Sequence, residues 1–290
     1  MGYRFCPSGR GNPERSSGKG GWRGAEFLVR GLGIAALLAT IFFQVMPREY
    51  AWRALFFVGI LPALFIFFVR RSVPEPDIYR EQRTPEERGR ALAIFRPGVI
   101  CRTVLGALLA VGAQGGYYAI TTWLPTFLQK ERGLTILSSG GYLAVIIIGS
   151  FTGYLVSAYL SDLIGRRSNF ILFAVGSVLV VVTYTEIPIS DSLMLVLGFP
   201  LGFFASGVFS GMGAFFTELF PTEIRGNAQG FCYNFGRGVA AGFPLLVGLL
   251  SARLPLGQAI GTYAAAAYLL MMIAAVALPE TRGTNLREIR

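Results

Sequence analysis

A chain of 290 residues with 53% hydrophobic content and a mean hydropathy of +0.55 is too apolar for a soluble globular domain. The net charge of +10 could suggest nucleic acid, but the basic residues are spread over short loops between apolar runs. We therefore expect an all-α, polytopic membrane protein, with the lipid bilayer and not nucleic acid as its surroundings.

Residues 1–23 are rich in Gly, Ser and Arg and contain no apolar run. Because the hydrophobic segment of a signal peptide is missing, we predict a disordered, low-complexity head.

Eight apolar stretches follow, and a helix needs about 20 such residues to cross a bilayer. Runs of this length exclude a β-barrel, whose strands are about half as long. Pro125 is expected to break the far end of the third stretch. The predicted spans are 28–46, 53–69, 99–127, 139–160, 169–187, 192–216, 228–250 and 257–278.

The predicted spans divide the chain into parts. Residues 24–70 hold two helices, and residues 71–98 form a charged, proline-containing loop. Residues 99–278 hold a six-helix bundle, and residues 279–290 form a tail.

The distribution of Lys and Arg predicts the orientation. On one side lie 18 of the 26 basic residues, together with both termini and the central loop, and 5 lie on the other. The remaining three, Arg30, Arg102 and Arg237, lie at membrane depth or its edge. We expect a multi-pass protein of the inner (plasma) membrane with both termini in the cytoplasm.

Cysteine and histidine usage exclude several kinds of site. Cys6, Cys101 and Cys232 are scattered and lack CxxC spacing, so we expect no disulfide framework and no metal site. The absence of histidine removes Ser-His and Cys-His catalysis, and a serine hydrolase in the membrane would still lack a visible base. We expect no enzyme activity and no bound cofactor.

A short loop with the spacing D-x-x-G-R-R follows the fourth span, at Asp162, Gly165, Arg166 and Arg167. Gly165 permits a tight reversal, and the arginines suit anionic headgroups. A positive-inside turn would explain the two arginines but not the spacing. The spacing resembles the loop signature of the major facilitator superfamily, although Ala158 and Leu163 depart from it.

Further stretches carry the same resemblance. ELFPTEIRGNAQG (218–230) and LPETRGTNLREI (278–289) are similar to loop and tail segments of sugar-porter-like members, and RRSVPEP (70–76) to the end of the N-terminal half. YYAITTWLPTFLQKERGL (117–134) resembles the seventh helix of carboxylate and sugar-acid proton symporters.

The resemblance implies two six-helix halves, of which this chain matches helices five to twelve. Residues 24–70 would then be a remnant of the N-terminal bundle, with the first four helices missing.

The implied function is secondary active, proton-coupled transport of a small organic anion or sugar-like solute by alternating access, by a monomer. The implied gate comprises Asp162, Gly165, Arg166, Arg167, Glu218 and Arg225. The alternative is a transport-incompetent fragment that needs a separate N-terminal half, and a membrane-embedded enzyme is less favoured.

Arg237 lies about ten residues into its predicted span, roughly 15 Å deep. A charge at this depth should face protein or water, since its insertion costs about 2.5–3.5 kcal/mol. Asn234 and Tyr233 fall near the same helical face, and together the three side chains suit capture of a carboxylate. The alternative is that Arg237 binds helix-end carbonyls or a gating partner.

The third span carries a polar stripe at i, i+4, i+7 and i+8, formed by Gln114, Tyr118, Thr121 and Thr122. We interpret it as a cavity lining that contacts substrate, with interhelical hydrogen bonding as the alternative. No Asp or Glu lies in the middle of a predicted span, so a proton-coupling group is expected in the missing helices, with Glu26 a weaker candidate.

Overall fold

The computed structural model describes residues 38, 41–42, 45–60, 92–134 and 136–283. The described part is helical and contains no strand. It falls into two compact units, one within residues 23–91 and one that includes Leu92 onward. The first unit contributes α2 (Arg48–Val58), which begins inside the loop expected between the first two spans. Most of those two spans, Glu26 and the head lie outside the described residues.

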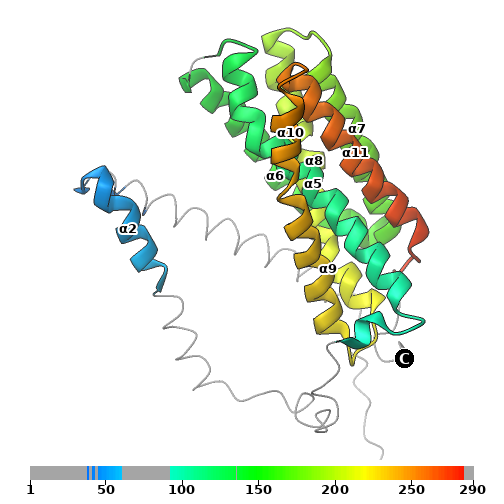
Figure 1. Cartoon of the computed structure of the whole chain (residues 1–290). Helices are drawn as coiled ribbons and strands as arrows, with labels where there is room; N and C mark the ends of the chain where they lie inside the picture. The colour runs from blue at the N-terminus through cyan, green and yellow to red at the C-terminus, as the bar shows by residue number, and fades with distance from the viewer. Residues whose placement is uncertain (1–37, 39–40, 43–44, 61–91, 135, 284–290) are drawn as a thin grey trace, which may run out of the picture. The chain divides into compact units, whose positions relative to one another are not determined.

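The second unit is a bundle of helices that run side by side (Figure 1). It comprises α5 (Ile100–Lys130), α6 (Ile136–Ile164), α7 (Arg166–Glu186), α8 (Asp191–Leu219), α9 (Arg225–Ala240), α10 (Phe243–Leu250) and α11 (Leu256–Ala277). In the described part, α5, α7, α8, α11 and residues 141–164 of α6 are long and apolar enough to cross a membrane. The chain is therefore an all-α, polytopic membrane protein.

The expected break at Pro125 is wrong, because α5 continues through it to Lys130. Proline removes one backbone donor and crowds the carbonyl four residues earlier, here that of Thr121, but the helix resumes beyond it. Membrane helices tolerate proline where neighbouring helices pack around the site. Leu124 and Phe127, on either side of Pro125, are both buried.

The predicted span 228–250 is two helices, α9 and α10, with a break at Ala241–Gly242. Pro244 lies at the start of α10 and has no N–H to bond back into α9. Instead, the Gly242 amide bonds the Val239 carbonyl at 3.0 Å, which tightens the turn. The break follows Arg237 by one turn.

Glycines set the closest helix contacts. A Cβ on Gly149 or Gly153 of α6 would overlap the backbone of α8 at Phe199 or Phe203. The same holds for Gly112 of α5 against α11. Small residues let membrane helices approach in this way, because packing rather than the hydrophobic effect holds them together.

The bundle repeats one packing pattern twice. Helix α5 packs against α9, α10 and α11, while α8 packs against α6 and α7 in the same relation. The segments α5, α6 and α7 correspond in order to α8, the α9–α10 pair and α11. Each contact in one set has its counterpart in the other, as expected for two three-helix repeats. The five-part division of the chain stays a prediction.

Candidate substrate face and charged cluster

Gln114 joins α5 to α9. Its side chain is only 2% exposed, and its amide nitrogen donates to the backbone carbonyl of Tyr233 at 3.0 Å. Three residues further along α9, Gly236 lies so close that an added Cβ would stand 2.5 Å from Ala110. Gln114 therefore holds the two helices in register, and its amide is already engaged within the bundle.

Arg237 lies outside this contact, about 100° around α9 from Gly236. Gly236 and Ala240 are buried, whereas Tyr233, Asn234 and Arg237 are exposed. The guanidinium of Arg237 makes no hydrogen bond or ion pair with any described residue. Asn234 donates to the Gly230 carbonyl of its own helix at 2.9 Å. The three residues of α9 that were predicted to bind substrate are thus all uncovered in this unit.

The other members of the polar stripe lie further along α5. Tyr118 is half-exposed, and Thr121 and Thr122 are exposed. The Thr121 hydroxyl donates to the Tyr117 carbonyl at 2.8 Å, a bond within the helix that also supports the backbone before Pro125. In the described part of the chain, no hydrogen bond connects Tyr118, Thr121 or Thr122 to Arg237.

Arg166 is the centre of a second group of polar residues, at the N-terminus of α7. Its side chain is 5% exposed, and Nε and Nη2 bind both oxygens of Glu218 at 3.2 and 3.0 Å. Nη1 contacts Asp162 and donates to the Ser161 hydroxyl at 3.2 Å. A guanidinium held by a two-pronged carboxylate contact has little freedom to move. Helices α6, α7 and α8 are therefore tied together at this end.

Glu280, after the end of α11, completes this group, which we call the Arg166 cluster (Ser161, Asp162, Arg166, Glu218, Glu280 and Thr281). Its carboxylate accepts from the backbone amides of Arg166 and Arg167 at 2.8 and 3.1 Å. These are orphan donors of the first turn of α7, and a negative charge is favourable there. The Thr281 hydroxyl donates to Glu218 at 2.7 Å.

Gly165 allows this arrangement. Its φ of +98° is a conformation that L side chains rarely adopt, and a Cβ would lie 2.6 Å from the Glu280 carboxylate. The side chain of Arg167 is half-exposed, and Arg225 donates to the Phe220 carbonyl at 3.3 Å. Of the six residues predicted for the gate, the structure brings Asp162, Gly165, Arg166 and Glu218 together. Sequence reasoning did not assign Glu280 or Thr281 to the site, although both lie in the LPET motif.

The long apolar helices and their repeated packing define a multi-pass membrane protein built from helical repeats. The sequence profile of the Major Facilitator Superfamily matches residues 12–192 and 148–289. The chain belongs to this superfamily, with a partial form of its fold.

Three relatives illustrate the similarity. The chain is 37% identical over 265 residues to a probable 4-methylmuconolactone transporter of Cupriavidus pinatubonensis, with 89% of this chain and 60% of the relative covered. It is 31% identical to a putative metabolite transport protein of Haemophilus influenzae, with coverage of 91% and 67%. It is 28% identical to the cis,cis-muconate transport protein of Acinetobacter baylyi, with coverage of 87% and 63%. The chain spans about 60% of the length of the first of these relatives.

Proposed function

We propose that the chain serves secondary active transport of a small organic anion across the inner membrane. The observation that supports this most directly is Arg237, an exposed cation without a partner among the described residues. It lies 12 residues after the start of α9, roughly 18 Å along the helix, near the middle of the α9–α10 segment. A charge at this depth is costly unless it serves a site, and a guanidinium is suited to a carboxylate.

The names of the relatives narrow the substrate class. Two of them are named for muconate or a methylmuconolactone, which are small organic acids or their lactones. A carboxylate on Arg237, with Tyr233 and Asn234 beside it, would place such a solute against α9. The hydroxyls of Tyr118, Thr121 and Thr122 on α5 would orient the rest of the solute.

The Arg166 cluster supports alternating access. Its members come from α6, α7, α8 and the segment after α11, so they keep one end of the bundle rigid. Alternating access by a rocking motion requires that each bundle moves as one rigid body. Asp162, Gly165, Arg166, Arg167, Glu218 and Arg225 would act as the gate at this end, which the charge distribution puts in the cytoplasm with both termini.

Uptake of radiolabelled cis,cis-muconate into proteoliposomes tests the transport proposal. We expect uptake that saturates, falls more than tenfold in Arg237→Ala and recovers in part in Arg237→Lys. Arg253→Ala, which removes an exposed arginine from the loop before α11, is the matched control and should transport normally. Uptake in Arg237→Ala equal to that of the unmodified chain would remove Arg237 from the binding role.

Proton coupling and the need for a partner are tested in the same vesicles. We propose that an inward proton gradient drives uptake, so collapse of the gradient with a protonophore should abolish accumulation. Uptake that only reaches equilibrium, at a rate the protonophore does not change, would favour uniport. A parallel arm adds the N-terminal helices of the 4-methylmuconolactone transporter. Activity only in that arm would favour the alternative, a fragment that needs a separate N-terminal half. We also propose that the chain is a monomer, which light scattering in detergent tests.

A further inference from the structure

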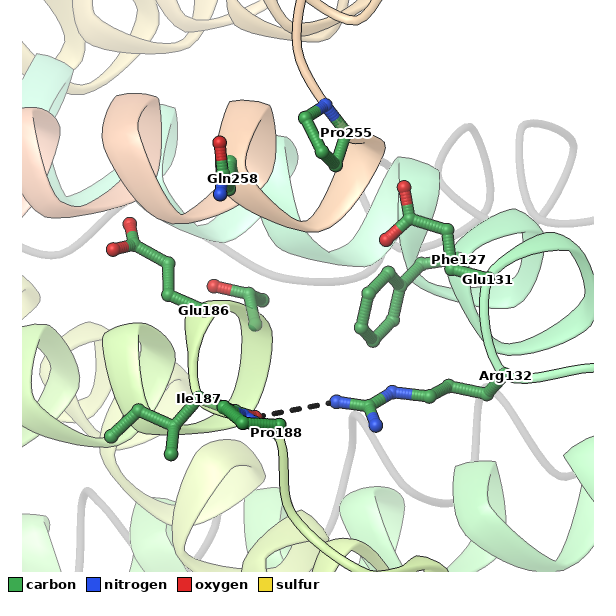
Figure 2. A pocket seen from close by; sticks show the side chains of 9 residues that line it. Phe127, Glu131, Arg132, Glu186, Ile187, Pro188, Pro255 and Gln258 are labelled. Carbon is green, nitrogen blue, oxygen red and sulfur yellow. Dashed lines mark hydrogen bonds between the residues drawn. The ribbon is translucent and has the colours of Figure 1, made fainter.

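A hollow lies at the other end of the bundle from the Arg166 cluster, where α5 and α7 end and α11 begins (Figure 2). Its volume is about 240 Å³. It is lined by Phe127 of α5, by Glu131 and Arg132 just after that helix, by Thr185 and Glu186 of α7, and by Gln258 of α11. None of these residues belongs to the proposed substrate face or gate.

The two residues that directly follow α5 hold the ends of two other helices at this hollow. The Glu131 carboxylate accepts from the first amides of α11, those of Leu256 and Gly257. The Arg132 guanidinium donates to the carbonyls of Ile187 and Ile189, after the end of α7, at 3.4 and 3.3 Å. Each charge has the sign that the adjacent helix end favours. The Arg132 guanidinium also lies over the Phe127 ring, 5.7 Å from its centroid, in a cation–π contact.

Opposite charges face this hollow without pairing. Arg132 forms no ion pair with Glu131 or Glu186, and Glu186 has no hydrogen-bond partner among the described residues. Figure 2 shows Arg132 and Glu186 on different sides of the hollow, with Gln258 near Glu186. The two bonds of Arg132 use one N–H on each terminal nitrogen and leave further donors free, since a guanidinium has five. A ligand with an anionic and a cationic group would satisfy both sides.

Helix lengths place the hollow at the level of lipid headgroups. The 31 residues of α5 extend roughly 46 Å, close to the full bilayer thickness of about 40–45 Å. The 21 residues of α7 and 22 of α11 extend only roughly 32–33 Å, about the thickness of the hydrocarbon core. Their ends therefore meet α5 at the boundary between hydrocarbon and headgroups. Ile187, which lines the hollow, is 46% exposed and offers an apolar surface for an acyl chain.

We propose that this hollow binds the zwitterionic headgroup of a phospholipid that carries a primary ammonium and a phosphate, as phosphatidylethanolamine does. Arg132 binds the phosphate, and Glu186, with Gln258 beside it, accepts hydrogen bonds from the ammonium. The site lies in the leaflet opposite the Arg166 cluster. The proposal requires only that the bundle spans a bilayer, so it stands or falls independently of the transported substrate.

Native mass spectrometry of the full chain in a delipidating detergent tests this, with phosphatidylethanolamine, phosphatidylglycerol or phosphatidylcholine added. Phosphatidylethanolamine should bind about tenfold more tightly than phosphatidylglycerol, which lacks the ammonium, and more tightly than phosphatidylcholine, whose ammonium donates no hydrogen bond. Glu186→Gln should reduce this binding about tenfold. Glu223→Gln, which changes an exposed carboxylate at the other end of the bundle, should leave it unchanged.

Glu186 is exposed, so its substitution leaves the packing intact, whereas Arg132 also holds the end of α7. Equal retention of the three lipids, or equal binding of phosphatidylethanolamine by the unmodified chain and Glu186→Gln, would overturn the proposal. Competition by free O-phosphoethanolamine would support recognition of the headgroup. If the protein binds free O-phosphoethanolamine but does not retain phosphatidylethanolamine, the ligand of the hollow is not a lipid. That result would overturn the proposal.

Discussion

The side-chain amide of Gln114 on α5 is bonded to the backbone carbonyl of Tyr233 on α9, 119 residues away, at 3.0 Å. Arg237 lies one helical turn beyond that carbonyl, on a face that the bundle leaves uncovered. The bond fixes the rotation of α9 about its axis and hence the direction in which Arg237 points. Gln114 is thus a positioning residue for the proposed substrate site.

Replacing Gln114 by Leu should disturb Arg237 without removing it. The side chain keeps its size but loses one buried hydrogen bond, which costs about 1 kcal/mol, and leaves no donor for the Tyr233 carbonyl. We expect weaker binding of labelled organic anion, measured by scintillation proximity, with a small loss of thermal stability. Gln129→Leu, an exposed position on the same helix, should change neither. Normal anion binding in Gln114→Leu would contradict the positioning role.

Two glycines on α9 form a matched pair for the same contact. Gly236→Ala places a methyl group 2.5 Å from Ala110, so α9 must move away from α5, at a cost of about 1–3 kcal/mol. Nothing lies within 4 Å of the equivalent position at Gly238, where alanine should stabilise the helix by about 0.5–1 kcal/mol. Thermal unfolding in detergent should therefore shift in opposite directions, and equal shifts would contradict the close α5–α9 contact.

The neighbours Arg166 and Arg167 should differ sharply in their effect on stability. Arg166→Ala leaves the partly buried carboxylates of Asp162 and Glu218 without their cation, a change that costs about 2–3 kcal/mol. Arg167→Ala removes a half-exposed charge from the same turn and should cost about 0.5 kcal/mol or less. Urea unfolding of the two variants, followed by tryptophan fluorescence, measures the difference. Similar losses would mean that the Arg166 cluster does not hold the bundle.

Gly165→Ala tests the turn between α6 and α7. Alanine is strained at a φ of +98°, and its methyl group would displace the Glu280 carboxylate from the start of α7. We expect a loss of more than about 1 kcal/mol in thermal unfolding. Gly213→Ala, in the interior of α8 with open space around it, should be neutral or stabilising. A harmless Gly165→Ala would show that this backbone conformation is not required.

The spans could be predicted from the sequence because length and hydropathy determine them almost alone. The predicted third, fourth, fifth, sixth and eighth stretches correspond to α5, α6, α7, α8 and α11. What a proline does within a span could not be predicted in the same way, since it depends on neighbouring helices. The helix continues through Pro125 in α5, whereas Pro244 accompanies the break between α9 and α10.

The candidate sites, too, could be predicted from the sequence only in part. The D-x-x-G-R-R spacing grouped Asp162 with Arg166 through its resemblance to a loop signature, and the structure pairs them across the turn at Gly165. The partners of Arg166 on α8 and after α11 are 52 or more residues away along the chain, and no local pattern pairs them. The stripe on α5 likewise predicted a polar face but not which helix lies against it. Gln114 meets α9, whereas Thr121 and Thr122 stay exposed.

Chemical accessibility of position 237 tests the central claim, that Arg237 faces a watery site that receives an anion. Arg237→Cys, in a chain in which Cys6, Cys101 and Cys232 are replaced, would be treated with a charged, membrane-impermeant thiosulfonate reagent, which reacts with the ionised thiol found only in water. We predict rapid modification that is slowed by cis,cis-muconate. Modification only by lipid-soluble reagents, with no protection by any organic anion, would contradict the account.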